Sequence, residues 1–159
     1  MNEKNTCCFF GHRKIVITEC LVESLQNEIE KLIKEKKVKT FLFGSRSEFD
    51  DLCHKVVSEL KEKYSDIVRI YVRAEFPYIN DEYEKYLSNR YEESYYPEKI
   101  KGAGKASYIE RNNEMIEKSE YCIFYYDEEY VPIRGKKSGT KIAYEYAKKK
   151  GKKIKNMKK

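Results

Sequence analysis

The segment CCFFGHR, residues 7–13, joins a run of four apolar residues to a glycine and two basic residues. The segment TFLFGSRS, residues 40–47, repeats this arrangement after an amphipathic stretch, from about Thr18 to Lys36, whose apolar residues recur at helical spacing. Short apolar runs that alternate with helices are typical of parallel sheets in α/β proteins. The two segments therefore predict two buried strands, each followed by a loop at the same edge of one sheet.

The rest of the chain continues this alternation of strands and helices. We expect helices at about 47–60, 107–116 and 138–147, strands at 67–72 and 121–126, and a short edge strand at 152–157. Ser47 and Asp50, like Ser107 and Glu110, have capping-box spacing at two of the helix starts. The sequence thus predicts an α/β fold, a Rossmann-like three-layer sandwich with a central, mostly parallel sheet of about five strands.

Length and composition favour a single domain spanning 1–159, because 159 residues suit one hydrophobic core. A tyrosine-rich insertion at about 73–103 interrupts the alternation, and we expect a long loop there with one helix at 81–90. Its six tyrosines could offer a stacking surface for a base. Packing against the domain or against a second subunit is the interpretation we favour, because buried tyrosine can keep its hydroxyl group in water.

The charge is unevenly distributed along the chain. Residues 148–159 form a basic tail with eight lysines and no acid, so that the formal net charge of +6 leaves −2 on the remaining body. A mildly acidic body differs from a basic nucleic-acid-binding face, and we expect the tail to be a solvated end and nucleic acid not to be the partner.

Other function classes are disfavoured by what the sequence lacks. No apolar run is long enough to span a bilayer, and the start MNEKNT has no signal-peptide features, so we expect a cytoplasmic protein without a membrane partner. Five cysteines without a regular framework suit a reducing compartment. Cys7 and Cys8 should point to opposite faces of a strand, and we therefore expect no metal site and assign no cofactor.

Four segments at the predicted carboxyl edge of the sheet carry glycines, hydroxyl groups and cations. They are Gly11, His12 and Arg13; Gly44, Ser45, Arg46 and Ser47; Arg111 and Asn112; and Ser138, Gly139 and Thr140, which follow Lys136 and Lys137. Glycine lets a ligand approach the backbone, arginine pairs with anions, and free amides at a helix start attract phosphate. Because such loops converge on one crevice, they predict a site for a phosphate-bearing, nucleotide-type small molecule.

The ordered set of these motifs resembles the SLOG superfamily. The set consists of GHR at 11–13, GSRSEFD at 44–50, ERNNEM at 110–115, YYD at 125–127 and SGT at 138–140. This superfamily of Rossmann-like domains includes the DNA-processing Smf/DprA proteins, the LOG-type cytokinin-activating phosphoribohydrolases and ligand-sensing domains of antiphage systems. The likeness covers nearly the whole chain and is closest to a small stand-alone bacterial or phage branch. It implies nucleotide binding and, because such domains commonly pair, a homo-oligomer.

The resemblance also bears on catalysis. Arg111 resembles the arginine of the LOG-type catalytic motif, and Asp50 falls where relatives keep an acid. Asp127 could replace a missing carboxylate or contact ribose hydroxyls. LOG enzymes place a glutamate shortly after their Gly-Thr, whereas Glu145 comes two positions late, a rotation of roughly 200° around a helix. Because cleavage of an N-glycosidic bond needs a carboxylate near the sugar, we assign no catalytic residue and expect binding rather than cleavage.

Two functions therefore compete. The leading hypothesis is a protein that binds a nucleotide or nucleotide-derived signalling molecule, either as a sensor or as a sponge that sequesters an immune second messenger in antiphage defence or anti-defence. The alternative is a nucleotide phosphoribohydrolase or N-glycosidase of LOG type. Single-stranded DNA binding in the DprA manner ranks below both, because the body of the chain is not basic.

Overall fold

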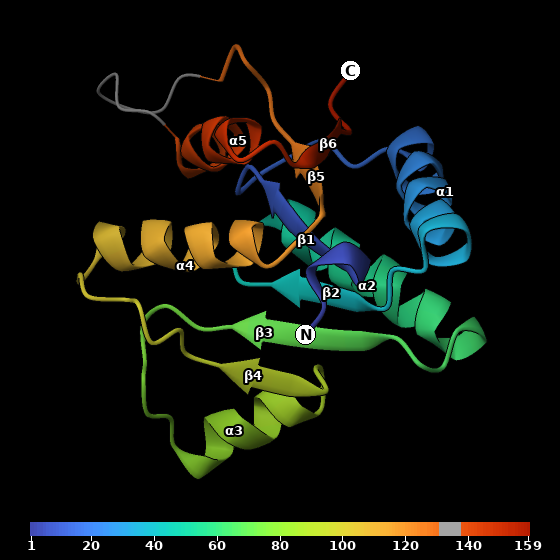
Figure 1. Cartoon of the computed structure of the whole chain (residues 1–159). Helices are drawn as coiled ribbons and strands as arrows, with labels where there is room; N and C mark the ends of the chain where they lie inside the picture. The colour runs from blue at the N-terminus through green and yellow to red at the C-terminus, as the bar shows by residue number, and fades with distance from the viewer. Residues whose placement is uncertain (131–137) are drawn as a thin grey trace.

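Six parallel strands form one sheet in the order β4-β3-β2-β1-β5-β6 in the computed structural model, which describes residues 1–130 and 138–159 (Figure 1). The strands are β1 (Thr6–Gly11), β2 (Thr40–Phe43), β3 (Val68–Val72), β4 (Glu93–Tyr95), β5 (Tyr121–Tyr125) and β6 (Lys153–Asn156). In the centre of the sheet, Cys8 is paired with Leu42 on one side and with Cys122 on the other. The chain order reverses between β1 and β5, and this reversal is the topological switch point of an open α/β sheet.

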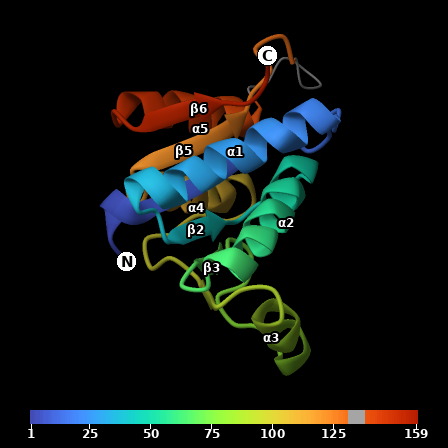
Figure 2. The ribbon, with the colours of Figure 1, turned by 90° about the vertical axis from the view of Figure 1, so that its right-hand side faces the viewer.

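Helices cover both faces of the sheet. They are α1 (Glu19–Lys36), α2 (Glu48–Lys63), α3 (Asp81–Ser88), α4 (Lys105–Glu117) and α5 (Gly139–Lys149), and a short 3-10 helix, Glu3–Asn5, precedes β1. Helices α1 and α2 pack on one face, where Cys7 and Phe9 join their core (Figure 2). Helices α4 and α5 pack on the other face with Cys8 and Phe10. The predicted Rossmann-like three-layer sandwich, and the opposite orientation of Cys7 and Cys8, are confirmed.

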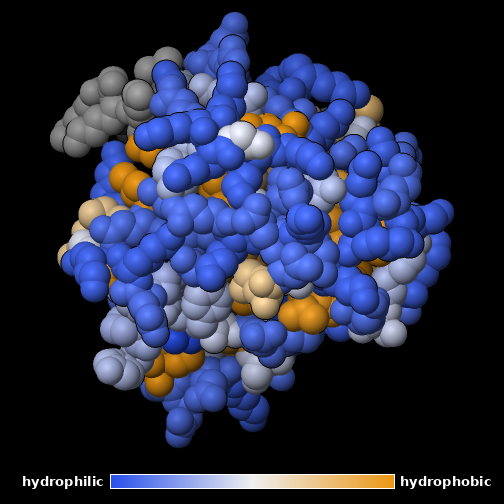
Figure 3. All heavy atoms as spheres, viewed as in Figure 1, coloured by the Kyte–Doolittle hydropathy of each residue, from blue (hydrophilic) through white to orange (hydrophobic). Residues whose placement is uncertain are grey.

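The covered sheet leaves a polar exterior. On the face shown in Figure 3, hydrophilic side chains dominate and hydrophobic residues appear as small separate patches. No helix in the described ranges is long and apolar enough to cross a bilayer.

Side-chain caps begin most of the described helices. Thr18, Ser47, Asn80 and Ser138 each accept a backbone N–H three residues along the chain, at the starts of α1, α2, α3 and α5. Helix α4 differs, and its predicted capping box is wrong. It begins at Lys105, after Gly104, whose φ is positive (60°), and the Ser107 hydroxyl donates to the Gly104 carbonyl at 2.7 Å. The Glu110 carboxylate instead accepts the N–H groups of Lys101 and Gly102.

The insertion at 73–103 contains more regular structure than the sequence predicts. Helix α3 matches the expected helix, but β4 was not foreseen and extends the sheet to six strands. Its sequence, Glu-Ser-Tyr, has no apolar run, and β4 pairs with β3 from Ile70 to Val72. The open edge of β3, rather than local propensity, therefore defines this strand.

The basic tail is not a solvated end. Residues 153–156 form β6 beside β5, and the Met157 N–H donates to the Phe124 carbonyl at 2.7 Å. Met157 is 7% exposed, so the tail closes the core at this edge. The weakly patterned edge strand at 152–157 thus forms, and the expectation of a solvated tail is wrong for this part.

Candidate functional site

The loops after β1 and β5 meet at the switch point through His12. This side chain is 5% exposed, and its Nε2 atom accepts the N–H of Asp127 at 2.9 Å. Burial lowers the pKa of His12, which suits a neutral ring acting as an acceptor. The ring also stacks on Tyr130, with centroids 4.4 Å apart. His12 therefore joins two loops of the fold, while the Asp127 carboxylate accepts the N–H of Glu129.

Packing explains why two positions at this edge are glycine: Gly11, which ends β1, and Gly44, which follows β2. A Cβ atom at Gly11 would lie 2.5 Å from the Phe49 side chain. A Cβ atom at Gly44 would lie 2.8 Å from both Arg111 Cδ and Met115 Sδ. Contacts this short do not occur between real side chains, so each glycine makes room for a neighbouring side chain of the protein.

The start of α2 uses most of its free amides within the protein. The Ser47 hydroxyl accepts the Asp50 N–H at 3.0 Å, and the Ser45 hydroxyl accepts the Ser47 N–H at 3.2 Å. The N–H of Glu48 donates to the carbonyl of Arg13 at 2.8 Å. These are the amides that the sequence predicts to be free to bind a phosphate. The anion-binding role predicted for Gly44, Ser45, Arg46 and Ser47 therefore depends mainly on the exposed side chain of Arg46.

Arg111 holds the carboxyl ends of two strands together. Its guanidinium is 4% exposed and donates to the carbonyl of Gly44, after β2, and to that of Val72, in β3. Its Nε–H donates to the Asn112 side chain at 2.8 Å, so Asn112 orients the guanidinium. The predicted site residues Gly44, Arg111 and Asn112 thus lie together, but their hydrogen bonds run to one another.

Asp50 lies beneath this edge rather than on its surface. It is 2% exposed, and its Oδ1 atom has no hydrogen-bond partner among the described residues. Burial raises its pKa well above the ordinary value, against the attraction of Arg111. A carboxyl group in this position does not reach a ligand in the pockets described next.

Three adjoining pockets lie at the carboxyl ends of β2 and β3, beside α3, and Arg46 and Tyr83 line all three. We call them together the Arg46–Tyr83 groove. The first, of about 270 Å³, is also lined by Phe76, Tyr78, Ile79 and Asn80. The second, of about 440 Å³, is also lined by Ser45, Asp51, Tyr71, Tyr86, Leu87, Arg90 and Tyr91. The third, of about 10 Å³, adds Arg73, Ala74, Glu75 and Arg111, together with Tyr71 and Phe76.

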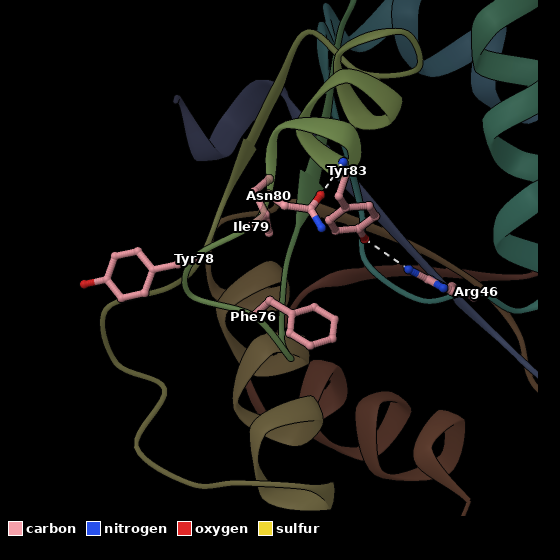
Figure 4. A pocket seen from close by; sticks show the side chains of 6 residues that line it. All are labelled: Arg46, Phe76, Tyr78, Ile79, Asn80 and Tyr83. Carbon is pink, nitrogen blue, oxygen red and sulfur yellow. Dashed lines mark hydrogen bonds between the residues drawn. The ribbon is translucent and has the colours of Figure 1, made fainter.

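In the groove, two stacked tyrosine rings lie between two guanidinium groups. Arg46 donates to the Tyr83 hydroxyl at 3.0 Å, and hydrogen bonds to tyrosine hydroxyls raise its pKa (Figure 4). The rings of Tyr83 and Tyr86 stack with centroids 6.1 Å apart and planes 11° apart. The Arg90 guanidinium lies 5.6 Å from the Tyr86 ring centre. The groove therefore offers positive charge and flat aromatic surface within one depression.

The tyrosines of the insertion divide between two roles. Tyr91 is 8% exposed and packs into the core, as the favoured interpretation predicts. Tyr83 and Tyr86 line the groove, and Tyr91 contributes to its wall as well. Phe76, Asn80 and Arg90 were not among the predicted site residues, because nothing in their spacing shows that they come to lie beside Arg46. The tyrosine-rich composition was the one signal of an aromatic surface.

The structure describes only residues 138–140 of the fourth predicted segment. Ser138 caps α5 by accepting the Lys141 N–H at 3.0 Å, and a Cβ atom at Gly139 would meet no side chain of the described residues within 4 Å. The amino terminus of α5 lies at the carboxyl edge of the sheet (Figure 1). Lys136 and Lys137 lie outside the described residues. Thr140 is 8% exposed, whereas Glu145 is exposed on α5.

No cluster of three or more His, Cys, Asp or Glu side chains within residues 1–130 and 138–159 is arranged to hold a metal ion.

Comparisons with known proteins identify a family and a fold. The family model YpsA, described as the YspA SLOG family, matches residues 5–159. DNA processing protein A (DprA) from Streptococcus pneumoniae is 13% identical, with a TM-score of 0.56 over 92% of this chain and 48% of that chain. DprA from Helicobacter pylori, whose structure is described for a single-stranded DNA binding mode, is 15% identical, with a TM-score of 0.61 over 96% of this chain and 64% of that chain. The chain thus spans less than two thirds of either DprA structure. No curated protein matches the sequence.

Proposed function

Because the chain belongs to the YpsA family of SLOG proteins, we propose that it binds a nucleotide or nucleotide-derived signalling molecule in the Arg46–Tyr83 groove. The observation that carries this proposal is the pair of stacked tyrosine rings, Tyr83 and Tyr86, between the guanidinium groups of Arg46 and Arg90 in one groove. Phosphates pair with guanidinium groups, and bases stack on aromatic rings. The SLOG family and the DprA-like fold support binding of nucleotides or nucleic acid in general.

A small ligand fits the groove better than a nucleic-acid strand. The larger pocket holds about 440 Å³, within the range of roughly 300–1,000 Å³ that is usual for small-molecule sites. Carboxylates of Asp51 and Glu75 also line the groove and would repel a continuous phosphate backbone. A ligand with one or two phosphates can instead pair locally with Arg46 and Arg90.

We further propose that the protein holds this ligand without cleaving it. Hydrolysis of an N-glycosidic bond needs a carboxylate beside the sugar. Asp50 is buried and does not line the groove, and the Asp127 carboxylate is bonded to a backbone amide near the switch point. Two carboxylates do line the groove, Asp51 and Glu75, and Glu75 accepts the hydroxyl of Tyr108 at 2.5 Å. Holding the ligand intact therefore requires that neither Asp51 nor Glu75 acts on the sugar, and a test for released free base examines this.

Isothermal titration calorimetry against linear, cyclic and ADP-ribose-type nucleotides tests the proposal. Arg46→Ala should weaken binding roughly tenfold or more, because it removes charge-assisted hydrogen bonds to phosphate. Arg13→Ala reports on the loop after β1 instead. Lys39→Ala is the matched control, because this cation pairs with Asp66 at 3.2 Å just before β2, at the amino end of that strand.

Each of several outcomes would contradict a defined part of the proposal. Absence of binding by the folded protein to every nucleotide rejects the function. Loss of binding in Arg13→Ala but not in Arg46→Ala moves the site to the switch point. Binding of single-stranded oligonucleotides without binding of mononucleotides rejects a small ligand. If chromatography detects free base after prolonged incubation, the protein cleaves its ligand, and the proposal that it holds the ligand intact is rejected.

A further inference from the structure

The pocket of about 270 Å³ at one end of the groove has the surfaces of a base-binding site. Its lining is mainly apolar and aromatic, with the Phe76 and Tyr83 rings and the Ile79 side chain. Arg46 stands at its far side, bonded to the Tyr83 hydroxyl (Figure 4). A base between these rings would place its attached phosphate beside Arg46. This step rests on the proposed function, because it assigns the two parts of a nucleotide to two parts of the same groove.

Asn80 is the polar side chain that faces this space, and the fold fixes its orientation. Its Oδ1 atom accepts the Tyr83 N–H at 2.8 Å as the cap of α3. The amide nitrogen therefore lies on the opposite side, and Figure 4 shows it directed toward the gap between the Tyr83 and Phe76 rings. Asn80 Nδ2 has no hydrogen bond to any other described residue. The pocket thus presents hydrogen-bond donors from Asn80, but not its acceptor.

From this geometry we infer that the pocket selects guanine over adenine. Asparagine recognises adenine with its oxygen and nitrogen together, accepting from N6 and donating to N7. The Asn80 oxygen points to the Tyr83 N–H at the start of α3 and the nitrogen points to the rings, so the two atoms do not face a base together as this two-point contact requires. Guanine presents two adjacent acceptors, O6 and N7, on the same edge. Both acceptors of guanine complement the donor group of Asn80, whereas adenine offers N7 alone and presents its N6 amino group, another donor, at the neighbouring position.

Two substitutions at Asn80 separate base recognition from the helix cap. Aspartate and serine cap helices about as well as asparagine, so both variants retain α3. Asn80→Asp replaces the donor with a carboxylate oxygen, which repels the guanine acceptors and accepts from the adenine amino group. Asn80→Ser removes the donor without adding an acceptor that reaches the base.

Calorimetric titration of GDP and ADP into the three proteins tests the inference. The wild type should bind GDP roughly tenfold more tightly than ADP, from one to two well-placed hydrogen bonds. Asn80→Asp should reverse this order, and Asn80→Ser should bring the two affinities close together.

The outcomes distinguish this inference from the function on which it rests. Binding of both nucleotides with equal affinity by the wild type, or an unchanged GDP preference in Asn80→Asp, overturns the base assignment and leaves nucleotide binding standing. Absence of binding of either nucleotide to the folded wild type, together with no binding across the wider nucleotide panel, overturns both.

Discussion

Single residues at the carboxyl edge of the sheet serve the protein's own packing before they serve a ligand. Gly11 leaves room for Phe49, and Gly44 leaves room for Arg111. Arg111 in turn bonds the carbonyls of Gly44 and Val72. Glycine and arginine in this pattern predict an anion site from sequence, yet here their neighbours are groups of the same chain. Arg46 is the predicted cation that this packing leaves facing the groove.

Substitution at Gly11 separates packing from ligand approach. Gly11→Ala should lower the free energy of unfolding by about 1–3 kcal/mol, because its Cβ would overlap Phe49. Gly139→Ala is the control, because no atom of the described residues beyond its chain neighbours and its own helix backbone lies within 4 Å of its Cβ position, and alanine favours the helix. Urea unfolding measures both. A Gly11→Ala protein of unchanged stability that loses nucleotide binding would instead show that the glycine admits the ligand.

The buried Asp50 predicts how stability depends on pH. Burial raises its pKa in the folded state above the ordinary value of 3.8. The folded state therefore retains a proton that the unfolded state releases. The associated stability is fully present below the unfolded pKa and is lost as pH rises through the folded pKa. The Asp50→Asn variant has no carboxyl group to lose a proton here. The free energy of unfolding of the variant, relative to that of the wild type, should therefore increase between about pH 4 and pH 7.

Urea unfolding of the wild type and Asp50→Asn across that pH range is the measurement. The contrary result is a wild type whose stability, relative to the variant, grows as the pH rises. That would mean that attraction between the carboxylate and Arg111 outweighs the cost of burying both charges.

At the scale of elements, the edges of the sheet are decided by pairing rather than by local pattern. Strand β4 follows the edge of β3, and β6 follows the edge of β5. The Asn156 side chain accepts from the Tyr126 N–H and donates to its carbonyl, each at 2.9 Å. These contacts join segments far apart in the sequence, which explains why the sequence alone left one edge strand unassigned and the other weak.

Removal of β6 tests its contribution to the fold. Deletion of residues 152–159 exposes the edge of β5 and removes the buried Met157 and the partly buried Ile154. The free energy of unfolding should fall by about 2 kcal/mol or more. Deletion of 158–159 alone is the control and should change it little. If the longer deletion is as stable as the wild type, the tail contributes nothing to the fold and behaves as the solvated end that its composition suggests.

For the molecule as a whole, the homo-oligomer stays a prediction. Tyr78, at the rim of the pocket of about 270 Å³, is 92% exposed, and its ring points away from that pocket in Figure 4. Light scattering should give at least twice the chain mass of 19.1 kDa. Tyr78→Ser should reduce the assembly if this segment forms the interface, and Val16→Ser, on an exposed loop elsewhere, is the control. A monomer at working concentration would contradict the prediction.

The sequence by itself determined the layered α/β fold and the SLOG family that the family model confirms, and it predicted the carboxyl edge of the sheet as the place of the site. These follow from patterns within a few residues, such as helical spacing, buried runs and caps, and from the order of motifs. Only the tertiary structure decided which polar groups remain available there. The amides of α2 bond to Ser45 and Arg13, while α3 brings Asn80 and Tyr83 to Arg46. Such partners lie far apart in the chain, so their contacts depend on packing and not on local sequence.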